Sequence, residues 1–175
     1  MTADIRLVLL DERHLPEMEK LAIDEGVLAF TRFPSPPEPG FIDAWYARYQ
    51  KGRIEGNKEA FAVLDDADQF LGVALAVDIN REEAEVELGY IVAPAVRGRG
   101  IAGELLRKLT DWTFAELGAQ RITLYIDVAN AGSSGAAANA GYQLEGVLRS
   151  AYHKQGLRSD TQVWSRLPSD PAPLP

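Results

Sequence analysis

The chain has 175 residues, of which 46% are hydrophobic and 25% charged, and its formal net charge is −8. This length suits one domain with a hydrophobic core and is short for two domains of ordinary size. No stretch approaches the roughly 20 apolar residues that cross a bilayer, and the N-terminus lacks the basic start and apolar run of a secretory signal. We therefore expect a cytoplasmic protein that does not insert into a membrane.

The composition also narrows the chemistry. The chain has no cysteine, which excludes disulfides, thiolate metal sites and a cysteine nucleophile, and its two histidines, His14 and His153, are separated by most of the chain. We expect no metal. The negative charge repels nucleic acid backbones, so nucleic acid is not an expected partner. It favours instead a cationic acceptor, such as an amine or a basic peptide end.

Hydrophobic spacing and turn residues predict one series of helices and strands without a repeat or a domain linker. Four prolines between Thr31 and Gly40 exclude regular helix there, and Gly118 is placed to stop the longest helix. In chain order, the patterns predict a strand at 5–10, a helix at 12–23 with Asp11 as its N-cap, a surface loop at 31–40, a helix at 41–51, strands at 60–64, 70–77 and 85–92, a helix at 101–117, a strand at 121–128, a short helix at 133–140 and strands at 142–152 and 159–166. The proline-rich tail, residues 168–175, is expected to be disordered.

The turn between the strand at 85–92 and the helix at 101–117 predicts a phosphate site. A helix start presents unpaired backbone N–H groups and a partial positive charge. Gly98 and Gly100 allow a ligand to approach the backbone closely, while Arg97 and Arg99 add positive charge. The expected ligand is a phosphate or a pyrophosphate.

Two common phosphate-binding motifs do not account for this turn. A P-loop requires Gly-Lys-Ser/Thr after its glycines, and none is present. Gly98, Gly100 and Gly103 match the dinucleotide pattern Gly-x-Gly-x-x-Gly literally. They follow an antiparallel meander without crossover helices, however, so the parallel sheet that this pattern needs is absent.

The same turn resembles the signature of a known superfamily. Arg97-Gly98-Arg99-Gly100-Ile101-Ala102 is similar to the Arg/Gln-x-x-Gly-x-Gly/Ala signature of the GCN5-related N-acetyltransferases, or GNAT enzymes. The segments 87–92, 130–133, 139–142 and 144–149, with Asp160, resemble in order and spacing the branch that includes the RimJ and RimL ribosomal-protein N-terminal acetyltransferases. The resemblance covers about residues 5–167 and is strongest from Glu85 onward.

This resemblance implies the fold and the position of the cofactor. We expect one α+β domain over residues 1–167, with a mixed, strongly twisted sheet of about seven strands and helices on both faces. Acetyl-CoA is the expected co-substrate, with its pantetheine in a central splay between the strands at 85–92 and 121–128. Its expected contacts are the backbone of Ile91 and Val92, the amides of Arg97, Gly98, Arg99, Gly100, Ile101, Ala102 and Gly103, and Asn130 and Asn139 from the other side.

Direct attack of a neutral amine on a thioester needs a base for the amine proton and a donor for the thiolate. Glu87 is our candidate base, the alternative being that it faces solvent or holds a neighbouring loop. Many relatives place a tyrosine seven residues after the asparagine, where this chain has Ala137. Ser133 matches the serine of the Asn-x-x-Ser pattern of the RimJ and RimL branch, which the resemblance places near the cofactor sulfur. It is our candidate acid, with an N-cap of its helix as the alternative. Tyr152 and His153 are lesser candidates.

The sequence thus predicts an N-acetyltransferase that moves an acetyl group from acetyl-CoA to a primary amine. The acceptor is a peptide or protein N-terminus or a small amine, bounded by the segments 30–40 and 152–159, and a homodimer is left open as the assembly. Because Ala137 replaces the usual tyrosine and glycines weaken the helix after Asn130, a non-catalytic acyl-CoA-binding module is the alternative.

Overall fold

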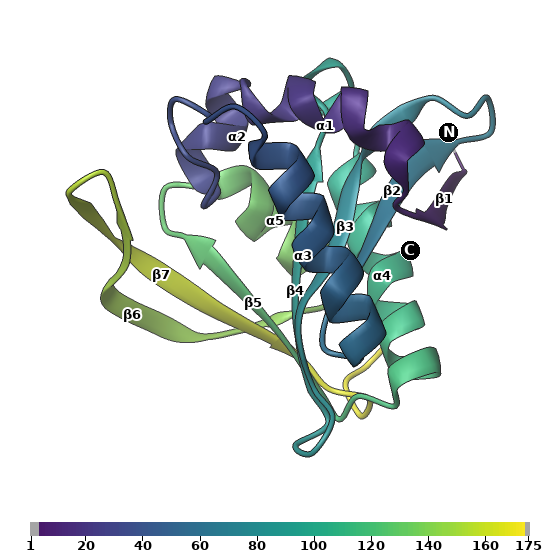
Figure 1. Cartoon of the computed structure of the whole chain (residues 1–175). Helices are drawn as coiled ribbons and strands as arrows, with labels where there is room; N and C mark the ends of the chain where they lie inside the picture. Colours follow the sequence, from purple (N-terminus) through teal and green to yellow (C-terminus); the bar gives the residue numbers. More distant parts are fainter. Residues whose placement is uncertain (1–3, 174–175) are drawn as a thin grey trace.

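The computed structural model describes residues 4–173, which form one mixed sheet covered by helices (Figure 1). The strands are β1 (Ile5–Leu9), β2 (Glu59–Asp65), β3 (Phe70–Asn80), β4 (Glu85–Val92), β5 (Arg121–Asp127), β6 (Gln143–Lys154) and β7 (Leu157–Arg166). The helices are α1 (Leu15–Ala22), α2 (Glu25–Phe30), α3 (Phe41–Glu55), α4 (Ile101–Leu117) and α5 (Ala131–Asn139), with 3-10 turns η1 (Glu12–His14) and η2 (Pro94–Val96). This is the predicted α+β fold.

The seven strands follow the order β1-β2-β3-β4-β5-β7-β6. The first four form an antiparallel meander, and β5, β7 and β6 pair antiparallel at the other end. The two halves meet in a parallel contact between β4 and β5, which joins residues 85–87 to residues 121–123 and goes no further. Beyond this contact β4 and β5 diverge (Figure 1), which confirms the predicted splay.

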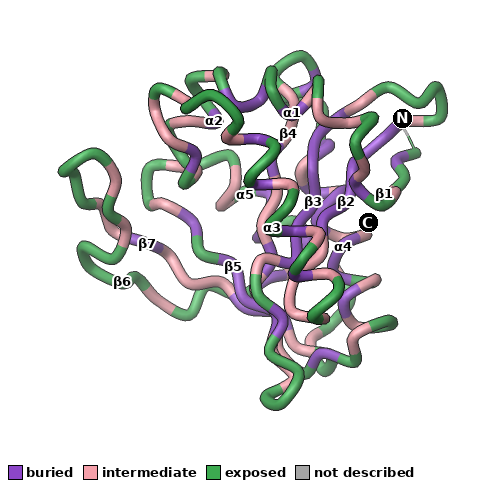
Figure 2. Tube along the Cα trace, in the orientation of Figure 1, coloured by how far each residue is buried: buried purple, intermediate pink, exposed green. Residues whose placement is uncertain are grey.

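Each face of the sheet buries its own hydrophobic cluster. One cluster joins α4 to side chains that include Val86, Leu88 and Ile122. The other joins α1 and α3 to the opposite face, with Trp45 and Ile91 among its members. Figure 2 shows the buried residues concentrated on β2, β3 and β4, whereas the outer end of the β6–β7 hairpin is exposed. Neighbouring residues of β4 therefore point to opposite faces of the molecule, as expected for a strand covered on both sides.

Arg121 holds the point at which the two halves of the sheet meet. Its Nε donates to Glu85 of β4 over 3.1 Å, and its Nη2 donates to Glu145 of β6 over 2.6 Å. Hydrogen bonds from Arg121 and from Ser165 lower the pKa of the Glu145 carboxyl to about 2. The two acceptors lie on different strands, so one guanidinium connects both halves of the sheet across β5.

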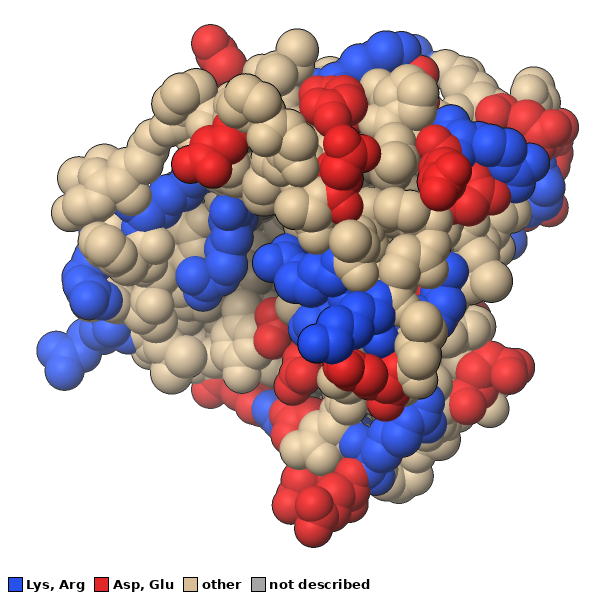
Figure 3. All heavy atoms as spheres, in the orientation of Figure 1, with Lys and Arg blue, Asp and Glu red and all other residues tan. Residues whose placement is uncertain are grey.

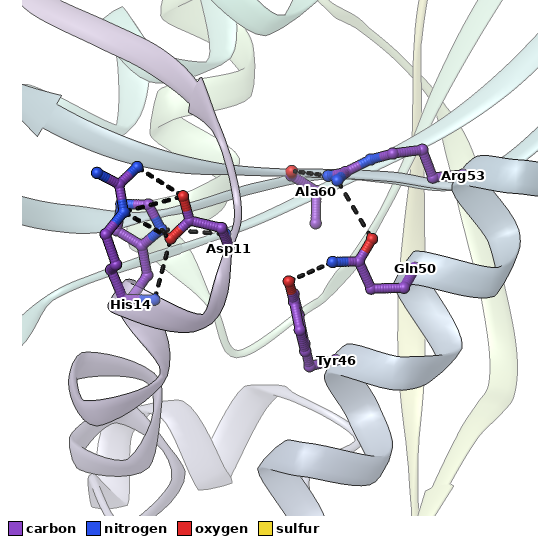
Figure 4. A network of polar contacts seen from close by, with 7 residues as sticks. Asp11, His14, Tyr46, Gln50, Arg53 and Ala60 are labelled. Atoms are coloured by element: carbon purple, nitrogen blue, oxygen red, sulfur yellow. Dashed lines mark hydrogen bonds and ion pairs between the residues drawn. The ribbon is translucent and has the colours of Figure 1, made fainter.

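Polar contacts also fix the helices on the α3 face (Figure 4). Arg53 of α3 donates to the Ala60 carbonyl of β2 over 3.2 Å, while Gln50 links Arg53 to the Tyr46 hydroxyl. At the start of η1, Asp11 accepts from the Arg13 amide over 3.0 Å. Asp11 is therefore the N-cap that the sequence predicts.

The observed elements differ from the predicted ones in several details. The predicted helix at 12–23 is divided into η1 and α1. Helix α2 is absent from the sequence-based series; its N-cap is Asp24, which accepts from the Val27 amide over 2.9 Å. Helix α5 begins at Ala131 and not at Ser133, because Asn130 is its N-cap. The disorder of the tail stays a prediction: Asp170 accepts from the Leu167 amide over 2.8 Å, and residues 174 and 175 lie outside the described residues.

Candidate active site

The splay opens into a cleft of about 1330 Å³ that reaches both faces of the sheet. Figure 3 shows its mouth as a hollow between the β6–β7 hairpin and α3. The predicted site residues that line it are Glu87, Ile91, Val92, Arg97, Gly98, Gly100, Ala102, Gly103, Asn130, Ser133 and Asn139. Arg99 is exposed outside this lining, and the Ile101 side chain is buried in the core at 6% exposure, so only its backbone amide faces the turn.

The start of α4 has the geometry of an anion site. Gly100 is the N-cap at φ +79°, and no side chain caps the helix. The amides of Ile101, Ala102 and Gly103 therefore lack intrahelical acceptors. No atom lies within 4 Å of where a Cβ would stand on Gly98 or Gly100, so the space above the turn is open. These features fit a pyrophosphate bound to backbone N–H groups.

The Arg97 side chain does not supply the free positive charge that the sequence predicts. Its Nη2 donates to the Asp24 carboxylate over 2.6 Å, and its Nε donates to the Val92 carbonyl over 3.2 Å. The guanidinium is therefore neutralised by an ion pair with the N-cap of α2. Of Arg97 and Arg99, the Arg97 backbone amide and the Arg99 side chain remain able to act on a phosphate, beside the free amides at the start of α4.

The edge of β4 exposes backbone groups to the gap. Pairing with β5 ends at Glu87, so the residues after it have no strand partner on that side. An extended ligand with amides can pair with such an edge as an added strand would. Pantetheine carries two amides, so the edge that includes Ile91 fits it. The Val92 carbonyl already accepts from Arg97.

Two cleft hydroxyls meet on the α4 side of the sheet. Asn130 accepts from the Ser133 amide over 3.1 Å, so the N-cap role that we considered for Ser133 belongs to Asn130. Burial raises the pKa of the Tyr90 phenol, and the nearby Ser133 hydroxyl partly offsets this shift. Within residues 4–173, the Tyr90 hydroxyl is the one buried side-chain polar atom without a hydrogen bond of good geometry.

A second tyrosine provides a contrast. The Tyr142 hydroxyl shares a 2.7 Å hydrogen bond with Thr110 in the core. A buried unpaired hydroxyl costs free energy, whereas a paired one does not. Tyr142 therefore has a structural partner, and Tyr90 does not. Ala137, which replaces the usual family tyrosine, is fully buried and does not line the cleft.

Glu87 lies on the opposite face of β4, at the vertex of the splay. It is paired with Thr123 in the last step of the β4–β5 contact. Burial raises the pKa of its carboxyl, Asp78 raises it further, and Arg32 and Lys58 partly offset the shift. A carboxylate with a raised pKa at a cleft is suited to accept a proton near neutral pH.

The two segments predicted to bound the acceptor are brought together on this face. The Tyr152 hydroxyl donates to the Thr31 carbonyl over 2.7 Å, and Gln155 Nε2 donates to the Ser35 carbonyl over 2.6 Å. The Arg32 guanidinium lies 5.0 Å from the centre of the Tyr152 ring. Tyr152 lines the cleft and His153 does not.

Neither a metal site nor a membrane helix is found within residues 4–173. No group of three or more His, Asp or Glu side chains in this range is arranged to hold a metal ion. In the same range, no helix combines the length and the apolar character that crossing a membrane requires.

Comparison with known proteins decides the family. The model of the acetyltransferase (GNAT) domain matches residues 4–143. The chain belongs to the GNAT acetyltransferases. This confirms the predicted superfamily.

Individual relatives agree with this family. The chain is 25% identical to the spermidine N(1)-acetyltransferase of Vibrio cholerae over 93% of this chain and 92% of that protein. The crystal structure of the Vibrio cholerae enzyme with CoA and spermine superposes with a TM-score of 0.84, at 23% identity over 95% of this chain and 96% of that one.

The ribosomal L7/L12 acetyltransferase RimL, solved with coenzyme A, superposes with a TM-score of 0.85, at 18% identity over 95% of each chain. The uncharacterized N-acetyltransferase YoaA of Bacillus subtilis is 29% identical over 57% of this chain, and the chain spans 56% of YoaA. These likenesses confirm the GNAT fold and place RimL among the structural neighbours.

We predict that Gly100→Val abolishes acetyl-CoA binding, because the side chain would occupy the open space above the helix start. The substitution forces valine into the left-handed region, which costs about 1–2 kcal/mol. Gly118→Val is the matched control, since Gly118 caps the other end of α4 at φ +63° in open space. Both variants should lose similar stability in thermal melts, but calorimetry should show lost binding in Gly100→Val alone. Equal affinities in the two variants would place the pyrophosphate elsewhere.

Proposed function

We propose that this protein is a cytoplasmic enzyme that transfers an acetyl group from acetyl-CoA to a primary amine, either on a small molecule or at a peptide or protein N-terminus. One observation carries the proposal. A single cleft joins an open helix start on one face of the sheet to a carboxylate, Glu87, on the other. Such a path lets two substrates enter from opposite faces and meet in the splay.

The relatives support an amine acceptor without identifying it. One acts on spermidine and another on ribosomal protein L7/L12, so both of the acceptor classes expected from the sequence occur among them. Self-association remains an expectation. It has support in the exposed Leu144, Val147 and Leu148 of the edge strand β6.

We assign the base to Glu87. Acetyl-CoA supplies a thioester that a neutral amine can attack, so the chain must hold that amine and remove a proton from it. Glu87 stands where the two sheet halves separate, on the face lined by the segment 30–33 and by Tyr152. Its raised pKa brings its basicity closer to neutral pH, because burial disfavours the carboxylate.

We assign the proton donor to Ser133, with Tyr90 as the group that supports it. Both hydroxyls lie on the α4 face, across the strand from Glu87. Ser133 is in the first turn of α5, where the helix dipole favours developing negative charge. The unpaired Tyr90 hydroxyl can donate to Ser133 when Ser133 donates its own proton. The pair would thus do the work of the family tyrosine, whose position Ala137 occupies.

The proposed transfer is tested by release of CoA. Acetyl-CoA is incubated with a panel of small amines and peptides, and free thiol is detected together with the acetylated product by mass spectrometry. We expect amine-dependent release by the natural protein and none by Gly100→Val. Binding of acetyl-CoA without release for any amine would favour the alternative, a non-catalytic acyl-CoA-binding module.

We predict that Glu87→Gln lowers turnover about 100-fold near pH 7 and less at pH values above the pKa of the amine, where neutral amine is abundant. The same variant should be more stable than the natural protein near pH 7. A carboxyl whose pKa is raised on folding stabilises the fold while protonated, and loses this contribution as the pH rises through the folded pKa. Glutamine does not ionise.

The matched control is Glu85→Gln, two residues away on the same face of β4. Glu85 binds Arg121 and Thr123 and does not line the cleft. It should therefore lose stability and keep turnover, the reverse of Glu87→Gln. A pH–rate profile of Glu87→Gln that parallels the natural one would remove Glu87 from the mechanism.

We predict that Ser133→Ala lowers turnover by about 100-fold or less, with little change in the Kd for acetyl-CoA. Tyr90→Phe should lower turnover less and leave thermal stability unchanged or increased, because it removes an unpaired buried hydroxyl. Tyr142→Phe is the control; it breaks the bond to Thr110, so it should cost about 1 kcal/mol of stability and no turnover. Full turnover in Ser133→Ala would refute the assignment.

A further inference from the structure

Two arginines on the acceptor side of the cleft have no anionic partner. Arg32, between α2 and α3, and Arg48, on α3, both line the cleft and are exposed. Among the hydrogen bonds and ion pairs of residues 4–173, neither guanidinium takes part. Figure 3 shows Lys and Arg atoms on both sides of the hollow between the β6–β7 hairpin and α3. Positive charge thus gathers at this mouth in a protein whose net charge is −8.

The segment that carries Arg32 is held in place by the hairpin. The Tyr152 hydroxyl and Lys154 Nζ both donate to the Thr31 carbonyl, over 2.7 and 2.8 Å. The Arg32 guanidinium lies over the Tyr152 ring at 5.0 Å, which is the geometry of a cation–π contact. Its position is therefore restricted before any ligand binds, which reduces the entropy that binding must overcome.

Arg48 and Arg32 face the same part of the cleft as Glu87. All three line the cleft. Burial raises the pKa of Glu87 and Arg32 partly offsets that shift, while Arg48 and Glu87 both influence the pKa of the Tyr49 phenol. Burial raises the pKa of Tyr49 to about 12, so this phenol stays neutral at physiological pH. The two guanidinium groups and the candidate base therefore line the same part of the cleft.

The other carboxylates near this volume form no ion pair with Arg32 or Arg48 within residues 4–173. Asp127 lines the cleft and accepts from Ser159 and from the Ala129 amide. Asp78 influences Glu87 but does not line the cleft. Lys58 and Lys154 are further cations, whose ammonium groups donate to the carbonyls of Val77, Leu28 and Thr31. Glu87 is the remaining carboxylate that lines the cleft, and it is assigned to the amine.

We infer that the acceptor carries an anionic group, a carboxylate or a phosphate, beside its primary amine, and that Arg32 and Arg48 bind this group while the amine meets Glu87. Guanidinium groups bind both anions through paired N–H donors. The inference rests on the proposed acetyl transfer and names its substrate class. It also reverses the expectation from net charge, which favoured a cationic acceptor. A polyamine would bring further positive charge to two unpaired arginines.

The test compares primary amines of different charge. The small acceptors are phosphoethanolamine, ethylamine and spermidine. The peptide acceptors are Ser-Asp-Asp-Ala and Ser-Lys-Lys-Ala, both with amidated C-termini. The small-molecule set tests for a free anionic amine as the acceptor, and the peptide set tests for an acidic protein N-terminus. The readout is the ratio of kcat/KM between the anionic and the neutral or cationic member of each set. We expect a preference for the anionic member in at least one set, decreasing as salt is added.

Arg32→Gln and Arg48→Gln should each lower this ratio about 10-fold or more, the size expected for a charge-assisted hydrogen bond. Any effect that Arg32 has through Glu87 changes both members of a set alike and leaves the ratio unchanged. Arg149→Gln is the matched control, because Arg149 is an exposed arginine of β6 that does not line the cleft. Its ratio should equal that of the natural protein.

Two results would overturn the inference: a ratio that stays the same in both cleft variants, or no preference for the anionic member in either set. A binding measurement distinguishes failure of this inference from failure of the proposed acetyl transfer. Calorimetry measures the affinity of the anionic acceptors for the natural protein and both variants in the presence of CoA. Arginine-dependent binding without CoA release would support the anion site and refute the acetyl transfer, whereas CoA release that is indifferent to both arginines would do the reverse.

Discussion

The structure depends on a parallel contact between β4 and β5 that lasts for only three residue pairs. Val86 and Ile122 bury this contact on the α4 face, and Arg121 binds it to β6 on the other. Past Glu87 the strands separate and leave two edges whose backbone groups face each other across a gap. Unpaired edge groups are costly when they are buried, so the gap is stable only as a solvated cleft or with a ligand that has amides of its own.

The alternation of side chains along β4 lets one strand present side chains to both faces of the cleft. Residues of odd and even number point to opposite faces, so Glu87 and Tyr90 are close in sequence but lie on different sides of the sheet. In an unbroken sheet the backbone would separate groups on one face from groups on the other. The splay leaves β4 unpaired after Glu87, so a group bound on the α4 side can contact a group bound on the α3 side.

Much of the fold could be predicted because its signals are local. The period of α4 and the glycines at its two ends, Gly100 and Gly118, give the helix and its limits. Helix α2 has six residues, which is too short for a periodic signal. The site was harder to predict, because charge balance is a tertiary property. The Arg97 guanidinium binds Asp24, 73 residues away in the sequence. Whether Arg32 and Arg48 form ion pairs depends likewise on which carboxylates the fold brings near them.

The ion pair between Arg97 and Asp24 also connects the turn before α4 to the start of α2. Asp24 caps α2, which borders the proposed acceptor side, and Arg97 belongs to the turn that leads into α4. Gly26 leaves the room that the guanidinium occupies, since a Cβ there would lie 2.7 Å from its Nη1. A displacement of α2 must therefore either move the turn or break a charge-assisted bond. A ligand that shifted one of these elements would in this way act on the other, and by linkage the effect would be equal in both directions.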